Sequence, residues 1–109
     1  MPNLIRFRSL FLVLLALTAV CRADGPDVRE SWEVQICSIP GSLHMPMGEV
    51  PGRAGELDAG APVVAICHHG GRSMQVGLFL EKNGYKKVHN LVGGVDAWSR
   101  TVDPSMPVY

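Results

Sequence analysis

The sequence contains no long hydrophobic run, no internal repeat and no low-complexity tract, and its formal charges cancel. Its 109 residues are enough for one domain. The longest nearly apolar run, residues 10–20, has eleven members, whereas a membrane-spanning helix needs about 20. The run is therefore too short for an ordinary membrane-spanning helix, and a single small domain is the expected organisation.

The order of residues at the start is typical of a secretory signal peptide. Arg6 and Arg8 precede the apolar run at residues 10–20, and small residues lead to Ala23. We predict a signal peptide over residues 1–23 with cleavage after Ala23, which makes the protein periplasmic or secreted. An uncleaved anchor and a mispredicted start codon are the alternatives, and without a true signal peptide the protein would be cytoplasmic.

Cleavage would leave a mildly acidic domain over residues 24–109. It would remove three of the ten basic residues and none of the ten acidic ones, so the net charge becomes −3. A negative net charge disfavours binding to nucleic acid and to membrane surfaces. We therefore expect no nucleic-acid partner and no membrane contact of the mature form. We also expect a monomer.

Cysteine is scarce. Of the three cysteines, Cys21 lies within the predicted signal peptide, so the mature domain keeps Cys37 and Cys67. In an oxidising compartment the two could pair, or one could stay a reactive thiol. The sequence leaves both possibilities open, together with a role for Cys37 as a resolving thiol for Cys67.

Short strands alternate with short helices along the remaining chain. The spacing of Trp32 and Ile36 predicts a helix over residues 31–37 that buries this face, and Gly25-Pro26 limits the strand around Val28 to a very short or edge strand. We further predict strands over residues 42–45, 63–66 and 87–92, helices over 73–82 and 95–100, and one or two helical turns around 53–57 within a loop over 48–60. This order predicts an α/β fold with a mainly parallel sheet.

Residues 63–74 carry the strongest functional signal. An apolar, β-branched strand is followed by Cys67, a turn containing Gly70 and Gly71, and a helix. An ordinary thiol, with a pKa of about 8.5, is only a few per cent thiolate at pH 7. The unpaired amides and positive dipole of a helix start stabilise a thiolate or a bound anion. We predict that Cys67 is a nucleophile, placed at the surface, in a cradle of amides.

The residues after Cys67 are predicted to bind an anionic substrate. Arg72 suits a bidentate oxyanion, and Ser73 is expected to cap the helix. His68 and His69 are expected to shape the loop and adjust the charge near the thiolate. Three consecutive residues rarely aim all their ligand atoms at one ion, so the sequence predicts no metal with Cys67 and no cofactor.

Several segments together resemble the single-domain rhodaneses. These are Asp-Val-Arg-Glu at 27–30, Ile-Pro-Gly-Ser with a following Met-Pro at 39–46, the Cys67 loop, and Leu-Val-Gly-Gly-Val-Asp-Ala-Trp at 91–98. The resemblance implies a small doubly wound sheet, with a truncated first strand here and the active loop after a central strand. It also implies that Asp27 and Arg29 are structural. A signal peptide running into the first strand is similar to the phage-shock type of periplasmic rhodanese.

The resemblance implies a sulfurtransferase that uses a cysteine persulfide. Its donor would be thiosulfate or a similar small molecule, and its acceptor cyanide or a thiol. Four residues separate Cys67 from Arg72, whereas cysteine phosphatases of related architecture have five. The shorter loop favours a sulfur atom on the cysteine over a phosphate group. A catalytically inactive rhodanese-like binding module and a small cysteine phosphatase or arsenate reductase are the alternatives.

Overall fold

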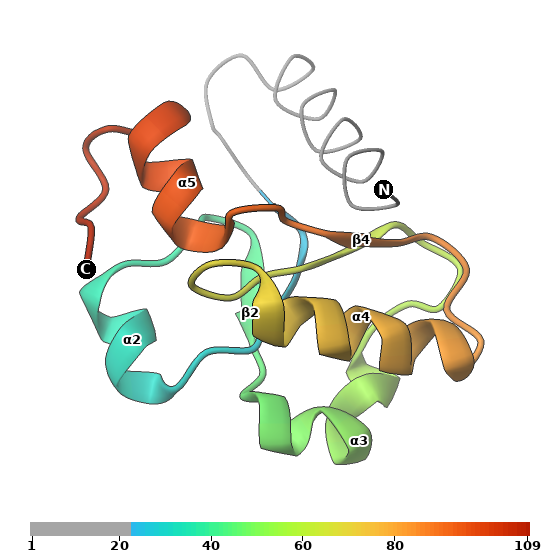
Figure 1. The fold of residues 1–109 in the computed structure, drawn as a ribbon. Helices are drawn as coiled ribbons and strands as arrows, with labels where there is room; N and C mark the ends of the chain where they lie inside the picture. Colours follow the sequence, from blue (N-terminus) through green and yellow to red (C-terminus); the bar gives the residue numbers. More distant parts are fainter. Residues whose placement is uncertain (1–22) are drawn as a thin grey trace.

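The computed structural model describes residues 23–109, so the predicted signal peptide lies almost entirely outside the described part (Figure 1). Ala23, where the predicted cleavage falls, is buried in this structure. No helix of the described part is long and apolar enough to span a membrane. The elements are β1 (Gly25–Asp27), α2 (Ser31–Ile36), β2 (Ser42–His44), η1 (Met47–Glu49), α3 (Val50–Arg53), η2 (Ala54–Glu56), β3 (Val63–Ala65), α4 (Gly71–Lys82), β4 (Val88–Asn90) and α5 (Gly94–Thr101).

All strand pairs of the described residues are parallel. Strand β1 pairs with β2, and β3 pairs with β4. Backbone hydrogen bonds join the two pairs through β1 and β3: the Val28 amide donates to the Ile66 carbonyl at 2.8 Å, and the Ile66 amide donates to the Pro26 carbonyl at 2.9 Å. The first strand is therefore very short, as predicted, but it lies between β2 and β3 and not at an edge.

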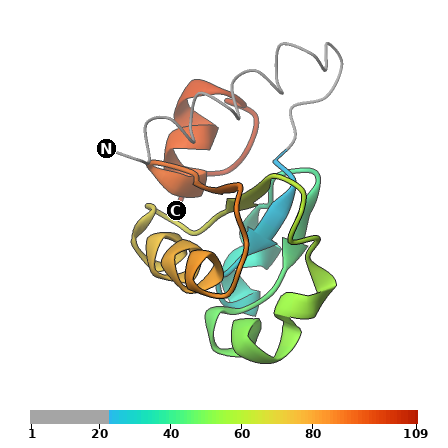
Figure 2. The same cartoon turned by 90° about the vertical axis from the view of Figure 1, so that its right-hand side faces the viewer.

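Two apolar clusters cover the two faces of the strands. Side chains of a strand alternate between faces, and Val64 and Ile66 accordingly belong to one cluster while Val63 and Cys67 belong to the other. Helix α5 contributes Trp98 to the first cluster, and the segments from β2 to α4 supply much of the second. Both views show α5 on one side of the strands and α3 and α4 on the other (Figures 1 and 2). The α/β, doubly wound arrangement predicted from the sequence is confirmed.

Helix α2 buries a different face from the one predicted. Trp32 and Ile36, expected in the core, are 62% and 39% exposed, whereas Glu33 is buried. The reason is electrostatic, because the Glu33 carboxylate accepts hydrogen bonds from Arg72 and Tyr109. These contacts turn the polar residue of the helix inward.

The helical segment before β3 is longer than predicted. Instead of one or two turns around residues 53–57, three short helical pieces follow one another from Met47 to Glu56. Pro51 lies in the first turn of α3, where its missing N–H leaves no intrahelical hydrogen bond unmade. The glycines of this segment favour a loop when the sequence is considered alone, whereas Pro51 is compatible with the first turn of a helix.

Candidate active site

Cys67 lies just beyond the carboxyl end of β3 and just before α4. Its Sγ accepts a hydrogen bond from the Gly70 amide at 3.0 Å and lies 3.3 Å from the Ser73 hydroxyl oxygen. Gly70 caps the helix with φ of 108°, a left-handed conformation that favours glycine. This turn aims its own amide at the sulfur. The strand, the glycine turn and the helix start therefore meet at the thiol, as the sequence predicts.

The sulfur is more enclosed than the sequence suggests. The prediction of a surface position for Cys67 is wrong, because the residue is 1% exposed and packs in the cluster that contains Val63 and Val76. The strand alternation explains this, since Cys67 continues the face that points toward α4. The thiol is therefore almost fully enclosed in this structure.

Ser73 lies inside the first turn of α4 and does not cap it, which corrects the prediction. The helix starts at Gly71, two residues earlier than expected, because Gly70 supplies the left-handed cap. The Ser73 hydroxyl is then buried between Cys67 Sγ and the Asn90 side-chain oxygen. A hydroxyl has one proton and two lone pairs. It can donate to a thiolate, or accept from a thiol while donating to Asn90.

Asn90 is a site residue that was not predicted from the sequence. It ends β4, the neighbour of β3, and its side-chain amide donates to the Gly70 carbonyl at 3.2 Å. The carboxyl ends of parallel strands meet at one edge of a sheet, where ligand sites form. The sequence predicts this strand over residues 87–92. Had its end been placed at Asn90, the rule would have indicated Asn90 as a site residue.

The start of α5 holds the Cys67 loop from its other side. The Val95 amide donates to the Cys67 carbonyl at 2.9 Å, and the Asp96 amide donates to the His68 carbonyl at 3.1 Å. Gly94 is required for this approach, because a Cβ on it would lie 2.4 Å from the Cys67 carbonyl oxygen. The glycine pair at 93–94 thus fixes the loop backbone on which the cradle depends.

Arg72 points to a carboxylate of the same chain. Two of its guanidinium nitrogens each lie 2.8 Å from an oxygen of Glu33, a bidentate pair. This pairing with Arg72 lowers the pKa of Glu33 to about 2. Glu33 also accepts the Tyr109 hydroxyl at 3.0 Å. Arg72 is therefore held beside the loop, and the prediction that it anchors a substrate anion stays a prediction.

Asp27 and Arg29 form a buried ion pair, at 2.7 Å between Arg29 Nη2 and Asp27 Oδ2. The same guanidinium donates to the Cys37 carbonyl at 2.8 Å and to the Tyr109 hydroxyl at 2.8 Å. A buried charge needs such partners to remain ionised. The pair ties β1 to the end of α2, which is a structural role.

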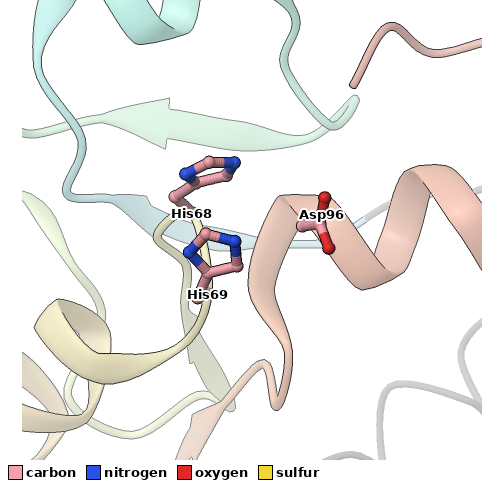
Figure 3. A group of neighbouring side chains, drawn as sticks. All are labelled: His68, His69 and Asp96. Atoms are coloured by element: carbon pink, nitrogen blue, oxygen red, sulfur yellow. The ribbon is translucent and has the colours of Figure 1, made fainter. Parts of the chain in front are cut away.

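His68 and His69 lie on the loop, next to each other and to α5 (Figure 3). Their ring centroids are 3.9 Å apart, and the Tyr109 ring stacks on His68 at 3.8 Å with an interplanar angle of 4°. Tyr109 thereby links this loop to the Glu33 and Arg29 network. Glu33 and Tyr109 were not predicted as site residues from the sequence, because no local pattern brings residues 33, 72 and 109 together.

The two cysteines of the described part are free thiols. Cys37 packs in the cluster that contains Trp98, and Cys67 in the cluster on the other face. The structure therefore contains no disulfide between them, and a resolving role for Cys37 is not supported by their placement.

The profile of the family described as "Rhodanese-like domain" matches residues 21–101. The chain belongs to the rhodanese-like family. A protein of Bacillus subtilis named putative sulfurtransferase YtwF is 41% identical over 78 residues, which span 72% of this chain and 75% of that protein. The human single-domain sulfurtransferase TSTD1 superposes with a TM-score of 0.69 at 25% identity, covering 84% of this chain and 90% of that one.

Other rhodanese-like relatives are larger proteins. The chloroplastic rhodanese-like/PpiC domain-containing protein 12 of Arabidopsis thaliana is 40% identical over 87 residues, but the match spans 76% of this chain and only 29% of that protein. The match thus spans less than a third of that relative's length. The rhodanese resemblance found in the sequence is confirmed.

Proposed function

We propose that this protein is a sulfurtransferase that carries a sulfane sulfur on Cys67. The observation that supports it most is the placement of the Cys67 sulfur within a rhodanese-like fold. Its Sγ receives the Gly70 amide at 3.0 Å at the start of α4. The amide and the helix dipole favour a negative charge on sulfur, which is the nucleophilic form.

The proposed reaction has two steps. The Cys67 thiolate attacks the outer sulfur of thiosulfate, a sulfur–sulfur bond forms, and sulfite leaves with the electron pair of the broken bond. Cyanide or a thiolate then attacks the outer sulfur of the persulfide and regenerates the Cys67 thiolate. No external oxidant or reductant is consumed. The Gly70 amide and the Ser73 hydroxyl are placed to stabilise the charge on the cysteine sulfur in both steps.

Binding of the donor is proposed to involve Arg72 and the loop from His68 to Ser73. An oxyanion such as thiosulfate would compete with Glu33 for the guanidinium, since both are bidentate partners of the same kind. Cys67 is 1% exposed, so the loop has to shift for the donor to reach it. We propose that the exchange of Arg72 from Glu33 to the donor accompanies that shift.

The test is a thiosulfate:cyanide assay on matched cysteine variants. Cys67→Ser should abolish turnover, whereas Cys37→Ser, which removes the other buried thiol, should retain it. Undiminished turnover of Cys67→Ser would contradict the proposal. A folded wild-type protein without turnover would indicate an inactive binding module. Parallel assays with an aryl phosphate and arsenate test the phosphatase and arsenate-reductase alternatives.

A further inference from the structure

A second group of chemically active side chains lies beside the cysteine loop. His68, His69 and Asp96 each place one potential ligand atom within 4.8 Å of the other two. The histidines come from the loop and the aspartate from the first turn of α5 (Figure 3). In the sequence, the adjacent residue with a further ligand atom is Cys67. The fold supplies a carboxylate in place of the thiol.

A backbone hydrogen bond joins the two segments that carry these three side chains. The Asp96 amide donates to the His68 carbonyl at 3.1 Å, so the two segments are hydrogen-bonded at the residues that carry the ligands. Stacking of the His68 ring on Tyr109, and its contact with the tilted His69 ring, restrict it further. A site held on hydrogen-bonded elements loses little conformational entropy on binding.

One ring nitrogen of the group has no hydrogen-bond partner within the described part of the chain. This atom, His68 Nε2, is buried. Buried polar nitrogens without partners are uncommon in folded proteins, and a bound ion or water molecule would satisfy this one.

We propose that His68, His69 and Asp96 bind one Zn²⁺ ion at the rim of the Cys67 loop. Two imidazole nitrogens and one carboxylate oxygen form a donor set of the kind found in zinc sites with an open position. Mg²⁺ and Ca²⁺ prefer oxygen ligands. The proposal rests on these side chains and does not depend on sulfur transfer by Cys67.

Arg100 is the competitor for the carboxylate. Its Nε lies 3.1 Å from Asp96 Oδ2, in a pair whose arginine side chain is 62% exposed. Exposed pairs of this kind contribute little, so Zn²⁺ can displace the guanidinium. Removing Arg100 should then tighten zinc binding.

The experiment is a calorimetric Zn²⁺ titration of the full, untagged chain carrying Cys67→Ser, so that the thiolate cannot act as a ligand. On this background His69→Ala and Asp96→Asn should each weaken the zinc affinity at least about tenfold. Asp58→Asn is the matched control, because Asp58 lies outside the group, and it should leave the affinity unchanged. Arg100→Ala should increase it. Proton NMR should show the His68 and His69 ring signals shifting with zinc.

Three results would overturn the proposal. One is no binding by the wild-type chain at millimolar Zn²⁺. Another is equal affinity in His69→Ala, Asp96→Asn and the control. The third is binding by the wild type that disappears in Cys67→Ser, which would make the thiolate the ligand. Because these readouts are binding and ring signals, a failure here is distinct from a failure of the sulfurtransferase assay.

Discussion

Glu33→Gln removes the negative charge that holds Arg72 while keeping the size of the side chain. In the wild type, hydrogen bonds from Arg72 lower the pKa of Glu33 from its usual 4.5 to about 2. One pKa unit corresponds to about 1.4 kcal/mol, so the full difference would correspond to about 3 kcal/mol. The Arg72 side chain is 36% exposed, so screening by water reduces the pairing energy. We expect Glu33→Gln to lower the free energy of unfolding by about 1–2 kcal/mol at neutral pH.

The pH dependence of this loss tests its origin. Because the folded-state pKa of Glu33 is depressed, its contribution to stability is complete above the unfolded pKa and declines as the pH falls toward about 2. Urea unfolding of wild type and Glu33→Gln should therefore differ most near neutral pH, begin to converge below about pH 4.5 and meet only toward about pH 2.

The control is Glu49→Gln, which breaks the exposed ion pair with Arg53. Exposed pairs are screened by water and contribute little, so this change should leave the urea midpoint nearly unchanged. A difference between wild type and Glu33→Gln that stays constant over the acidic range would refute the argument. So would a loss no larger than that of the control.

Two further predictions concern the loop and its cation. Gly94→Ala places a Cβ against the loop carbonyls at a residue whose φ is 63°. It should lower the free energy of unfolding by about 2–4 kcal/mol and slow sulfur transfer. The control Gly52→Ala, with open space around the added Cβ, should change the free energy of unfolding by less than about 1 kcal/mol. Equal behaviour of the two variants in thermal unfolding would contradict this reasoning. Arg72→Ala should raise the KM for thiosulfate about tenfold or more with a smaller effect on kcat, and an unchanged KM in steady-state kinetics would remove Arg72 from donor binding.

The strand–cysteine–helix unit is predictable because its signals are local. A β-branched run, a glycine turn and an apolar periodic segment follow one another within residues 63–82. The parallel sheet follows from the alternation of strands and helices. The buried position of Cys67 cannot be predicted from the sequence, because the glycine turn after it suggests a surface loop. Which face of β3 is covered by α4 is decided by packing in the folded protein.

The remainder of the site depends on contacts between distant residues. Glu33 pairs with Arg72, 39 positions away, and with Tyr109, 76 positions away. The apolar spacing of Trp32 and Ile36 predicts the opposite face of α2, because periodicity carries no information about a buried ion pair. The orientation of α2 follows the need to pair the buried Glu33 carboxylate, and not the apolar spacing of Trp32 and Ile36.

The most direct measurement of the central claim is mass spectrometry of the protein after treatment with thiosulfate. The account predicts an added mass of one sulfur atom, located on the peptide that contains Cys67 and removed by cyanide with release of thiocyanate. The same treatment of Cys67→Ser should add no such mass. An unmodified Cys67 in the folded wild-type protein, or a sulfur added to Cys37 instead, would contradict the account.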